Sequence, residues 1–222
     1  ARIATKVDEI RAANYNVLLL DAGDQFQGTL FYNLFKADII TLTMNALGYD
    51  AMTIGNHEFD DGPEELARLI DGAEFPIVSA NIDASAEPSL AGKIHPSTVI
   101  TLSGEPVGIV GLTSPETEEL SSPGNVVFSD TVTSLQDAID DLTDQGIDKI
   151  IALTHQGYQY DIVLAEAVGD VDIIVGGHSH TYLHTPPGEE HAGPYPTVVN
   201  DVLIVQAGSW GESLGHLNVS FD

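Results

Sequence analysis

The sequence predicts a single α/β domain in which a sandwich of sheets is flanked by helices. Short apolar segments with strand-like composition alternate with longer segments in which apolar residues recur at helical spacing. The chain has 222 residues, of which 43% are hydrophobic, and this is enough for one large domain with a buried core. No internal repeat or low-complexity linker divides it, so we expect no domain boundary inside the chain.

The first half of the chain is assigned from apolar spacing and turn residues. Residues 1–17 have a helical pattern, and a second helical stretch over 29–50 ends near Gly48, a residue type common at helix ends. A third helix is expected over 62–73, because Pro63 lies near its start and acidic residues follow, as the helix dipole favours. Strands are predicted over 16–23, 51–55 and 75–82, and a hairpin over 97–114 with its turn at residues 103–105.

The second half continues the alternation. A helix is predicted over 129–145, with its apolar face formed by Val132, Leu135, Ile139 and Leu142 and its end at Gly146. Further strands are expected over 149–153 and 172–175, with a helix from about Tyr160 between them. Residues 188–196 are predicted to form a loop rich in Pro and Gly, and the last strands are predicted over 202–206 and 214–221.

The charge of the chain is strongly negative. There are 34 Asp and Glu residues against 7 Lys and Arg, which gives a formal net charge of -27. Nucleic acid polymers and anionic membrane surfaces attract basic patches, so the charge argues against both as partners. There is no cysteine, which excludes a disulfide or a thiolate metal site. No run of eighteen apolar residues is present, so the sequence predicts no membrane span.

Four short motifs follow predicted apolar strands, at the position where α/β proteins usually place their sites. The candidate site residues in these motifs are two carboxylates, one amide and four imidazoles. This mixture of oxygen and nitrogen donors suits Mn, Fe or Zn better than a hard cation such as Ca. The motifs are GDQFQG (residues 23–28), GNHEFDDG (55–62), THQG (154–157) and GGHSHT (176–181).

Taken singly, most of these residues also have simpler explanations. Asp24 between glycines is typical of a turn, and so is Asn56 after Gly55. His155 at a strand end could be a hydrogen-bonded polar residue. The pair His178 and His180 is more specific, because residues at i and i+2 point the same way only from an extended backbone. The occurrence of all four motifs in order, each after a strand, favours a metal site.

These motifs, together with QAGSWGESLG at residues 206–215, resemble the ordered motifs of the calcineurin-like metallophosphoesterases, in the branch of the 5'-nucleotidases and UDP-sugar hydrolases. The resemblance covers essentially the whole chain. It implies a four-layer αββα sandwich of the metallo-dependent phosphatase type. It also implies hydrolysis of a small phosphate ester, with a nucleotide as the expected substrate, and a periplasmic or extracellular location. No signal peptide lies within the 222 residues.

The resemblance also assigns roles to individual residues. It implies two divalent metal ions, such as Mn, Zn or Fe, and a metal-bound hydroxide that attacks phosphorus. Asp24 corresponds to the carboxylate that bridges the two ions. Asn56, His155 and His178 correspond to ligands of one ion, and His180 to a ligand of the other. His57 corresponds to the catalytic histidine, and Asp60 to the acid that orients it.

The sequence departs from the family pattern in two places. The family begins with a strand that carries an Asp-x-His motif, and no histidine precedes Asp24 here. We therefore expect residues 1–222 to be a metallophosphoesterase domain without that first strand and without the C-terminal substrate domain. The ion served by His180 should then bind weakly. One alternative is a metal- or nucleotide-binding remnant with an incomplete second site. Another is a hydrolase of the same fold that acts on UDP-sugars, cyclic nucleotides or sulfur esters.

Overall fold

The structure, a computed structural model, describes residues 2–184 and 192–221. Its helices are α1 (Arg2–Ala13), α2 (Leu30–Phe35), α3 (Ala37–Leu47), α4 (Pro63–Gly72), α5 (Thr117–Leu120), α6 (Thr131–Thr143) and α7 (Tyr158–Ala167), with a 3₁₀ helix at His57–Phe59. Its strands are β1 (Leu20–Asp21), β2 (Ala51–Thr53), β3 (Ile77–Val78), β4 (Ile82–Asp83), β5 (Ser97–Leu102), β6 (Glu105–Thr113), β7 (Val127–Phe128), β8 (Ile150–His155), β9 (Ile173–Gly176), β10 (Thr197–Val199) and β11 (Val202–Val205).

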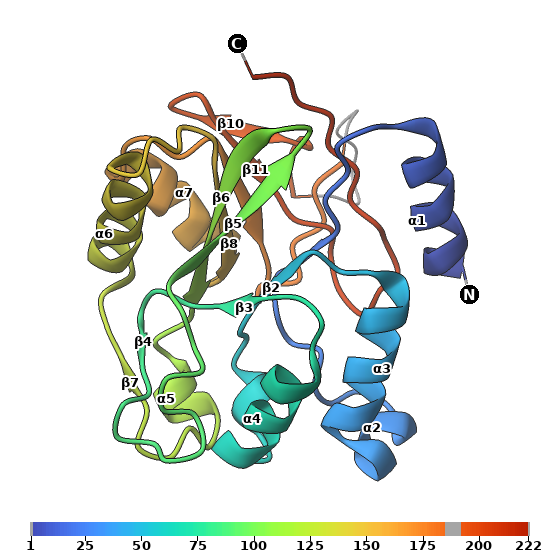
Figure 1. The fold of residues 1–222 in the computed structure, drawn as a ribbon, viewed down its shortest axis with the longest axis vertical. Helices are drawn as coiled ribbons and strands as arrows, with labels where there is room; N and C mark the ends of the chain where they lie inside the picture. Colours follow the sequence, from blue (N-terminus) through green and yellow to red (C-terminus); the bar gives the residue numbers. More distant parts are fainter. Residues whose placement is uncertain (1, 185–191, 222) are drawn as a thin grey trace.

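Two sheets form the centre of the molecule. The smaller sheet has the order β1-β2-β3, and its strands are parallel. The larger sheet has the order β10-β11-β9-β8-β6-β5, with parallel pairing in the middle and an antiparallel pair at each edge. Strands β4 and β7 form a separate antiparallel ribbon. In Figure 1, α6 and α7 lie beside the larger sheet, and α3 and α4 lie on the side of the smaller one.

Three hydrophobic clusters show that these layers pack as αββα. Residues of β8 alternate between two of the clusters, because successive side chains of a strand point to opposite faces. Ile150 and Ala152 pack with α6 and α7, whereas Ile151 and Leu153 face the space between the sheets. A third cluster joins the smaller sheet to α3 and α4, with Met52 among its members. The predicted four-layer sandwich is therefore confirmed, and the strand ends of both sheets meet at one site.

Local sequence signals explain the boundaries of several elements. Helix α4 begins after Gly62, whose φ of 88° suits glycine, and Pro63 starts the helix as predicted. Helix α6 is capped by Asp130, whose side chain accepts the Thr133 N–H at 2.9 Å. The predicted apolar face of α6 is buried at Leu135, Ile139 and Leu142. The hairpin β5–β6 also forms, with its turn at residues 103–104.

The predicted helix over 29–50 is in fact two helices. The backbone breaks at Lys36, where φ is 52°. Two contacts stabilise this break: Lys36 Nζ donates to Asp61 at 2.8 Å, and the Ala37 N–H donates to the Glu65 carboxylate at 2.8 Å. Apolar spacing continues through the break, so periodicity alone predicts one helix. The acidic partners lie 25 and 28 residues further along the chain.

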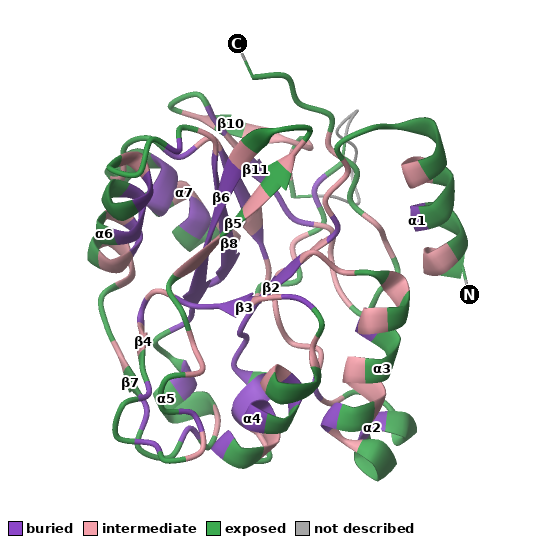
Figure 2. Ribbon diagram, in the orientation of Figure 1, coloured by how far each residue is buried: buried purple, intermediate pink, exposed green. Residues whose placement is uncertain are grey.

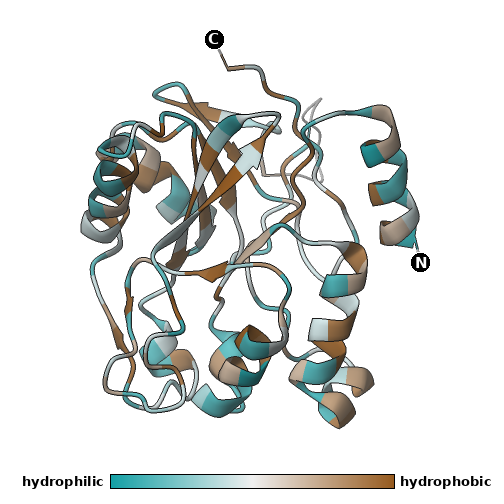
Figure 3. Cartoon of the chain, viewed as in Figure 1, coloured by the Kyte–Doolittle hydropathy of each residue, from teal (hydrophilic) through white to brown (hydrophobic). Residues whose placement is uncertain are grey.

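The first of these helices, α2, is largely exposed (Figure 2). Only Tyr32 is buried, and it packs against Phe26 in the core beside the smaller sheet. Hydrophobic residues therefore remain at this surface, as the colouring of α2 in Figure 3 shows. They are Leu30, Phe31, Leu34 and Phe35.

The predicted last strand, over residues 214–221, is wrong. The structure assigns no strand to the described residues beyond β11. Only Leu217 packs partly into the cluster between the sheets, while Val219 and Phe221 are exposed. Alternating apolar residues can give a segment one buried face, but a strand also needs a neighbouring edge with which to pair.

Several other predicted elements exist but are shorter than expected. The helix over 1–17 ends at Ala13, and the strands over 16–23 and 75–82 reduce to two-residue pairings. The predicted loop over 188–196 lies partly outside the described residues. None of the helices in the described part of the chain is both long and apolar enough to cross a membrane.

Candidate metal centre

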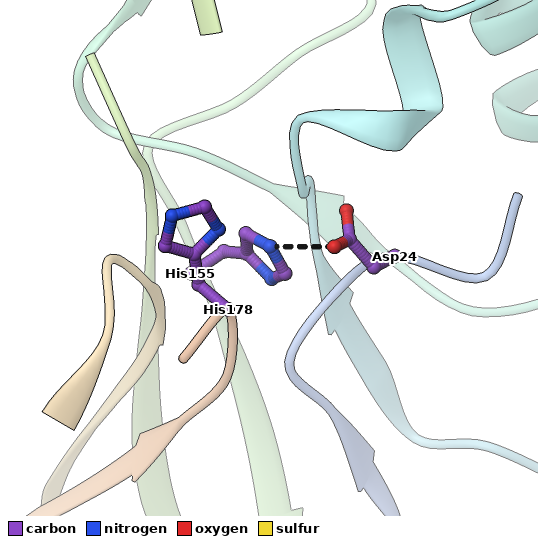
Figure 4. Close-up of side chains that lie close together, drawn as sticks. All are labelled: Asp24, His155 and His178. Atoms are coloured by element: carbon purple, nitrogen blue, oxygen red, sulfur yellow. Dashed lines mark ion pairs between the residues drawn. The ribbon is translucent and has the colours of Figure 1, made fainter. Parts of the chain in front are cut away.

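Four of the predicted ligand residues lie at strand ends that face one another. Asp24 follows β1 and Asn56 follows β2, both in the smaller sheet. His155 ends β8 and His178 follows β9, both in the larger sheet. The smaller sheet thus contributes two side chains with oxygen donors, and the larger sheet contributes two imidazoles at the facing strand ends. Figure 4 shows the two imidazole rings and the Asp24 carboxylate gathered there.

Three of these side chains present ligand atoms close enough for one ion, and Asn56 lies beside one of them. Asp24, His155 and His178 each offer one ligand atom, and these atoms lie within 4.8 Å of one another. His155 Nε2 is 3.0 Å from Asp24 Oδ2, and the two imidazole rings have centroids 5.0 Å apart. Asn56 Oδ1 lies 3.0 Å from His178 Nδ1. A mixed set of carboxylate, amide and imidazole donors fits Mn, Fe or Zn.

His155 shows most directly that the site suits a cation. Its Nδ1 lies 2.5 Å from the Ala22 carbonyl, which can only accept, so Nδ1 carries the hydrogen and Nε2 is free to coordinate. Nε2 is buried and, among the described residues, has no hydrogen-bond partner with acceptable geometry. Asp24 Oδ2 is at hydrogen-bonding distance, but its alignment is poor. A buried basic nitrogen against a carboxylate is the arrangement that a metal ion satisfies.

The electrostatics of this pair are strongly coupled. Burial would raise the pKa of Asp24, but the close contact with His155 and the charge of its ring outweigh burial and lower the pKa. Burial would lower the pKa of His155, yet Asp24 outweighs this and raises it. Without a cation, these shifts favour a negatively charged Asp24 and a positively charged His155. For His178, burial and the nearby His155 lower the pKa, which keeps its ring neutral and able to coordinate.

Glycines allow the ligand turns to approach one another closely. A Cβ on Gly23 would lie 2.5 Å from the backbone nitrogen of Gly55, and one on Gly55 would collide with the Asp24 side chain. A Cβ on Gly177 would lie 2.8 Å from the Ala22 carbonyl oxygen. Each of these glycines belongs to a predicted motif. They are needed because backbone from the two sheets meets here without room for side chains.

Three predicted ligands have left-handed backbone conformations, which side chains other than glycine rarely adopt. The φ angles are 64° at Asp24, 68° at His178 and 54° at His180. Such residues cost about 1–3 kcal/mol each and persist only where surrounding contacts fix them. For His178 and His180, this geometry replaces the extended backbone that their i, i+2 spacing led us to expect.

His57 and Asp60 form a pair beside the ligand group. His57 Nδ1 is 2.6 Å from Asp60 Oδ2, and Asp60 Oδ1 accepts the Ser121 hydroxyl at 2.6 Å. The His57 backbone N–H donates to Asp24 Oδ1 at 2.9 Å. Burial would lower the pKa of His57, but the hydrogen bond to Asp60 and the nearby acidic charges outweigh it and raise the pKa. The side chain is 46% exposed, so a ligand can reach the ring.

His180 is placed differently from the other predicted ligands. It is exposed and does not belong to the group of converging ligand atoms. Its ring lies edge-on to Trp210, with centroids 5.5 Å apart, and Trp210 is 82% exposed. Its predicted role as a ligand of a second ion stays a prediction.

Sequence reasoning missed Glu58, although it lies inside the motif GNHEFDDG. Its side chain is fully buried and accepts backbone N–H groups from Gly55 at 2.7 Å, Asp24 at 2.8 Å and Gln25 at 2.7 Å. Burial, together with the Asp24 charge, raises the pKa of Glu58 to about 7. Glu58 thus joins the turn that carries Asp24 to the turn that carries Asn56. The available signal was a Glu between two predicted functional residues in a glycine-bounded loop.

The fold and the ligand group together define a metal-binding αββα phosphoesterase domain. The family model of the calcineurin-like phosphoesterases matches residues 1–182, and the chain belongs to this family. The chain is 49% identical over 234 residues to a 5'-nucleotidase of Bos taurus, a match that covers 100% of this chain and 41% of the relative. The resemblance predicted from the motifs is therefore confirmed. The chain spans about two-fifths of the length of such relatives.

Solved structures give the same result. A 5'-nucleotidase precursor from Thermus thermophilus is 48% identical with a TM-score of 0.91, and the match covers 95% of this chain and 43% of that one. An NAD nucleotidase from Haemophilus influenzae is 34% identical with a TM-score of 0.83, covering 92% of this chain and 38% of that one.

Proposed function

We propose that this domain carries the metal-dependent centre of a phosphate ester hydrolase whose substrates are nucleotides. The convergence of Asp24, Asn56, His155 and His178 beside the His57–Asp60 pair carries this proposal. The names of the similar proteins, 5'-nucleotidases and an NAD nucleotidase, support a nucleotide as the substrate.

Two divalent ions are proposed as cofactors, with unequal ligand sets. Asp24, Asn56, His155 and His178 would hold the first ion. Asp24 and His180 are the ligands we assign to the second within the described part of the chain. When bound, such ions lower the pKa of water and stabilise negative charge on the phosphoryl oxygens. That role matters here because none of the four motifs contains Lys or Arg, and the substrate is an anion.

His57 is proposed to act directly on the phosphate ester. Asp60 holds Nδ1, which leaves Nε2 to donate a hydrogen bond to a phosphoryl oxygen or to the departing oxygen. The raised pKa of His57 favours the protonated ring that this role needs. Ser121 fixes the other oxygen of Asp60, so the pair has little rotational freedom. Catalysis by a positioned proton donor contributes about 10²–10⁴-fold in rate.

A non-catalytic alternative is a metal- or nucleotide-binding remnant. The incomplete second ligand set favours it, whereas the aligned His57–Asp60 pair opposes it, because binding alone needs no proton donor. Hydrolysis of UDP-sugars, cyclic nucleotides or sulfur esters by the same centre is a further alternative. An extracellular or periplasmic location also stays a proposal.

His57→Ala separates catalysis from binding. We expect it to keep the metal content of the wild type and to lower turnover of a nucleoside 5'-monophosphate by about 10²–10⁴-fold. Phosphate release and elemental analysis measure the two quantities on the same samples. His95→Ala is the matched control, since His95 is exposed and outside the motifs. If His57→Ala keeps the turnover of the wild type, His57 has no role in the mechanism. If the wild type binds metal but shows no turnover, the non-catalytic alternative is favoured.

A further inference from the structure

Gln206 is a buried amide that directly contacts the turn carrying His178 and His180. It follows β11 and is only 2% exposed. Because β11 pairs in parallel with β9, its end lies next to the end of β9, where the GGHSHT turn begins. The side chain therefore reaches the turn from the neighbouring strand.

The hydrogen bonds of Gln206 span the turn from one end to the other. Its Nε2 donates to the Gly177 carbonyl at 3.0 Å, immediately before His178. Its Oε1 accepts the Thr181 N–H at 2.5 Å, immediately after His180, and the Ser179 hydroxyl at 3.1 Å between the two histidines. One amide thus satisfies backbone groups on both sides of the two predicted ligands.

The turn needs such support because both histidines have positive φ angles, 68° and 54°. A backbone in this region relaxes unless its surroundings fix it. On the other side, Gly177 lies against the Ala22 carbonyl and the His155 ring, where a Cβ would have no room. The Ser179 hydroxyl also accepts the Tyr158 N–H at 3.0 Å, which ties the turn to the start of α7. Gln206 is the buried side chain that joins these parts.

We propose that Gln206 is a positioning residue of the metal centre, which fixes the backbone of the turn so that His178 stays in the group of ligands that would hold the first ion. It acts through the backbone of the turn and does not contact the reacting atoms. This inference rests on the proposed function, because it assumes that the ligand group binds a metal ion. The residue lies in the segment QAGSWGESLG, to which the motif resemblance gave no individual roles.

The test replaces Gln206 with methionine, which keeps a side chain of similar length but removes the donor and the acceptor. We expect Mn²⁺ affinity, measured by isothermal titration calorimetry, to fall by about 10- to 100-fold, the loss typical for residues that orient metal ligands. We also expect the visible absorption bands of the Co²⁺-loaded protein to shift, because they depend on ligand geometry.

Asn81→Leu is the matched control for lost stability. Asn81 is 1% exposed, and it too bridges backbone groups, donating to the Thr113 carbonyl at 2.8 Å and accepting the Thr113 N–H at 2.9 Å. It contacts none of the predicted ligands in these hydrogen bonds. We expect this variant to lower the melting temperature of the metal-free protein while Mn²⁺ affinity and the Co²⁺ spectrum stay unchanged.

A selective loss of Mn²⁺ affinity in Gln206→Met, with the control unaffected, supports the proposal. Affinity within twofold of the wild type and an unchanged Co²⁺ spectrum would overturn it and leave the proposed function standing. Equal losses in both variants would also overturn it, since general destabilisation would then explain them. A wild-type protein that binds no Mn²⁺ would overturn both this inference and the proposed function.

Discussion

The two parts of the predicted metal centre differ in how they are built. The first part, Asp24, Asn56, His155 and His178, draws ligands from both sheets, and His155 within it is almost fully buried. The second part contains His180, which is exposed and contacts Trp210. Several ligands that converge on one point form a site before an ion arrives, whereas a single ligand does not. We therefore expect the first ion to bind much more tightly than the second.

Asp24→Asn should have the largest effect, because Asp24 belongs to both parts. It removes the negative charge that faces His155 Nε2 at 3.0 Å. We expect affinity for the first ion to fall by more than the roughly 100-fold that loss of an orienting partner can cost. Calorimetric titration with Mn²⁺ measures this. Retention of wild-type affinity would mean that the bridging carboxylate has been assigned wrongly.

Asp161→Asn should make the free energy of unfolding depend less on pH. Asp161 is hydrogen-bonded to Thr154, the residue before His155. Asp161 is fully buried, Thr154 donates to its Oδ1 at 2.6 Å, and burial raises its pKa to about 7. The folded chain therefore favours the protonated acid. The protonated carboxyl therefore stabilises the fold fully below pH 3.8, the unfolded pKa. As pH rises to about 7, the free energy of unfolding falls by about 4 kcal/mol. Urea unfolding at pH 5 and pH 8 should show a smaller difference in the variant than in the wild type; an equal difference would contradict this.

Glu58→Gln tests whether the hydrogen bonds of Glu58 to the backbone of Asp24, Gln25 and Gly55 fix the positions of the ligands in the first part. The substitution keeps one acceptor but replaces the other oxygen with a donor that faces backbone N–H groups. We expect the free energy of unfolding to fall by about 1–3 kcal/mol, with weaker Mn²⁺ binding as a consequence. Denaturation and titration of the same variant measure both. Unchanged values would show that the two turns hold their positions without Glu58.

His180→Ala should have the smallest effect on the first ion. Its ring lies outside the converging ligand atoms, so we expect affinity for the tight ion to stay within about twofold of the wild type, as is usual for a substitution away from a site. His178→Ala serves as the contrasting variant, since it removes a ring within the group. Equal losses from the two substitutions would abolish the distinction between the two parts.

That the candidate ligands of the first part lie close together could be predicted from the sequence, because each follows an apolar strand within a short motif. Asp24, Asn56, His155 and His178 are far apart in the chain, but parallel strands bring their ends together. Glu58 and Gln206 could not be predicted in this way. Their roles depend on backbone atoms 25–34 residues distant, which side-chain chemistry and local spacing do not reveal.

The fold was predictable to a similar extent. The alternation of apolar segments indicated the layers, since each side of a strand such as β8 faces a different core. The break at Lys36 was not predictable, because it depends on Asp61 and Glu65. The strand expected over 214–221 did not form, because apolar alternation says nothing about whether an edge is free to pair.

The metal centre is tested most directly by the metal content of the wild-type chain after equilibration with Mn²⁺ and removal of weakly bound ions by gel filtration. We expect elemental analysis to find about one ion retained per chain, with a second detected only at higher free Mn²⁺. Retention of no ion would contradict the metal centre itself, and retention of two ions with equal affinity would contradict the difference between its two parts.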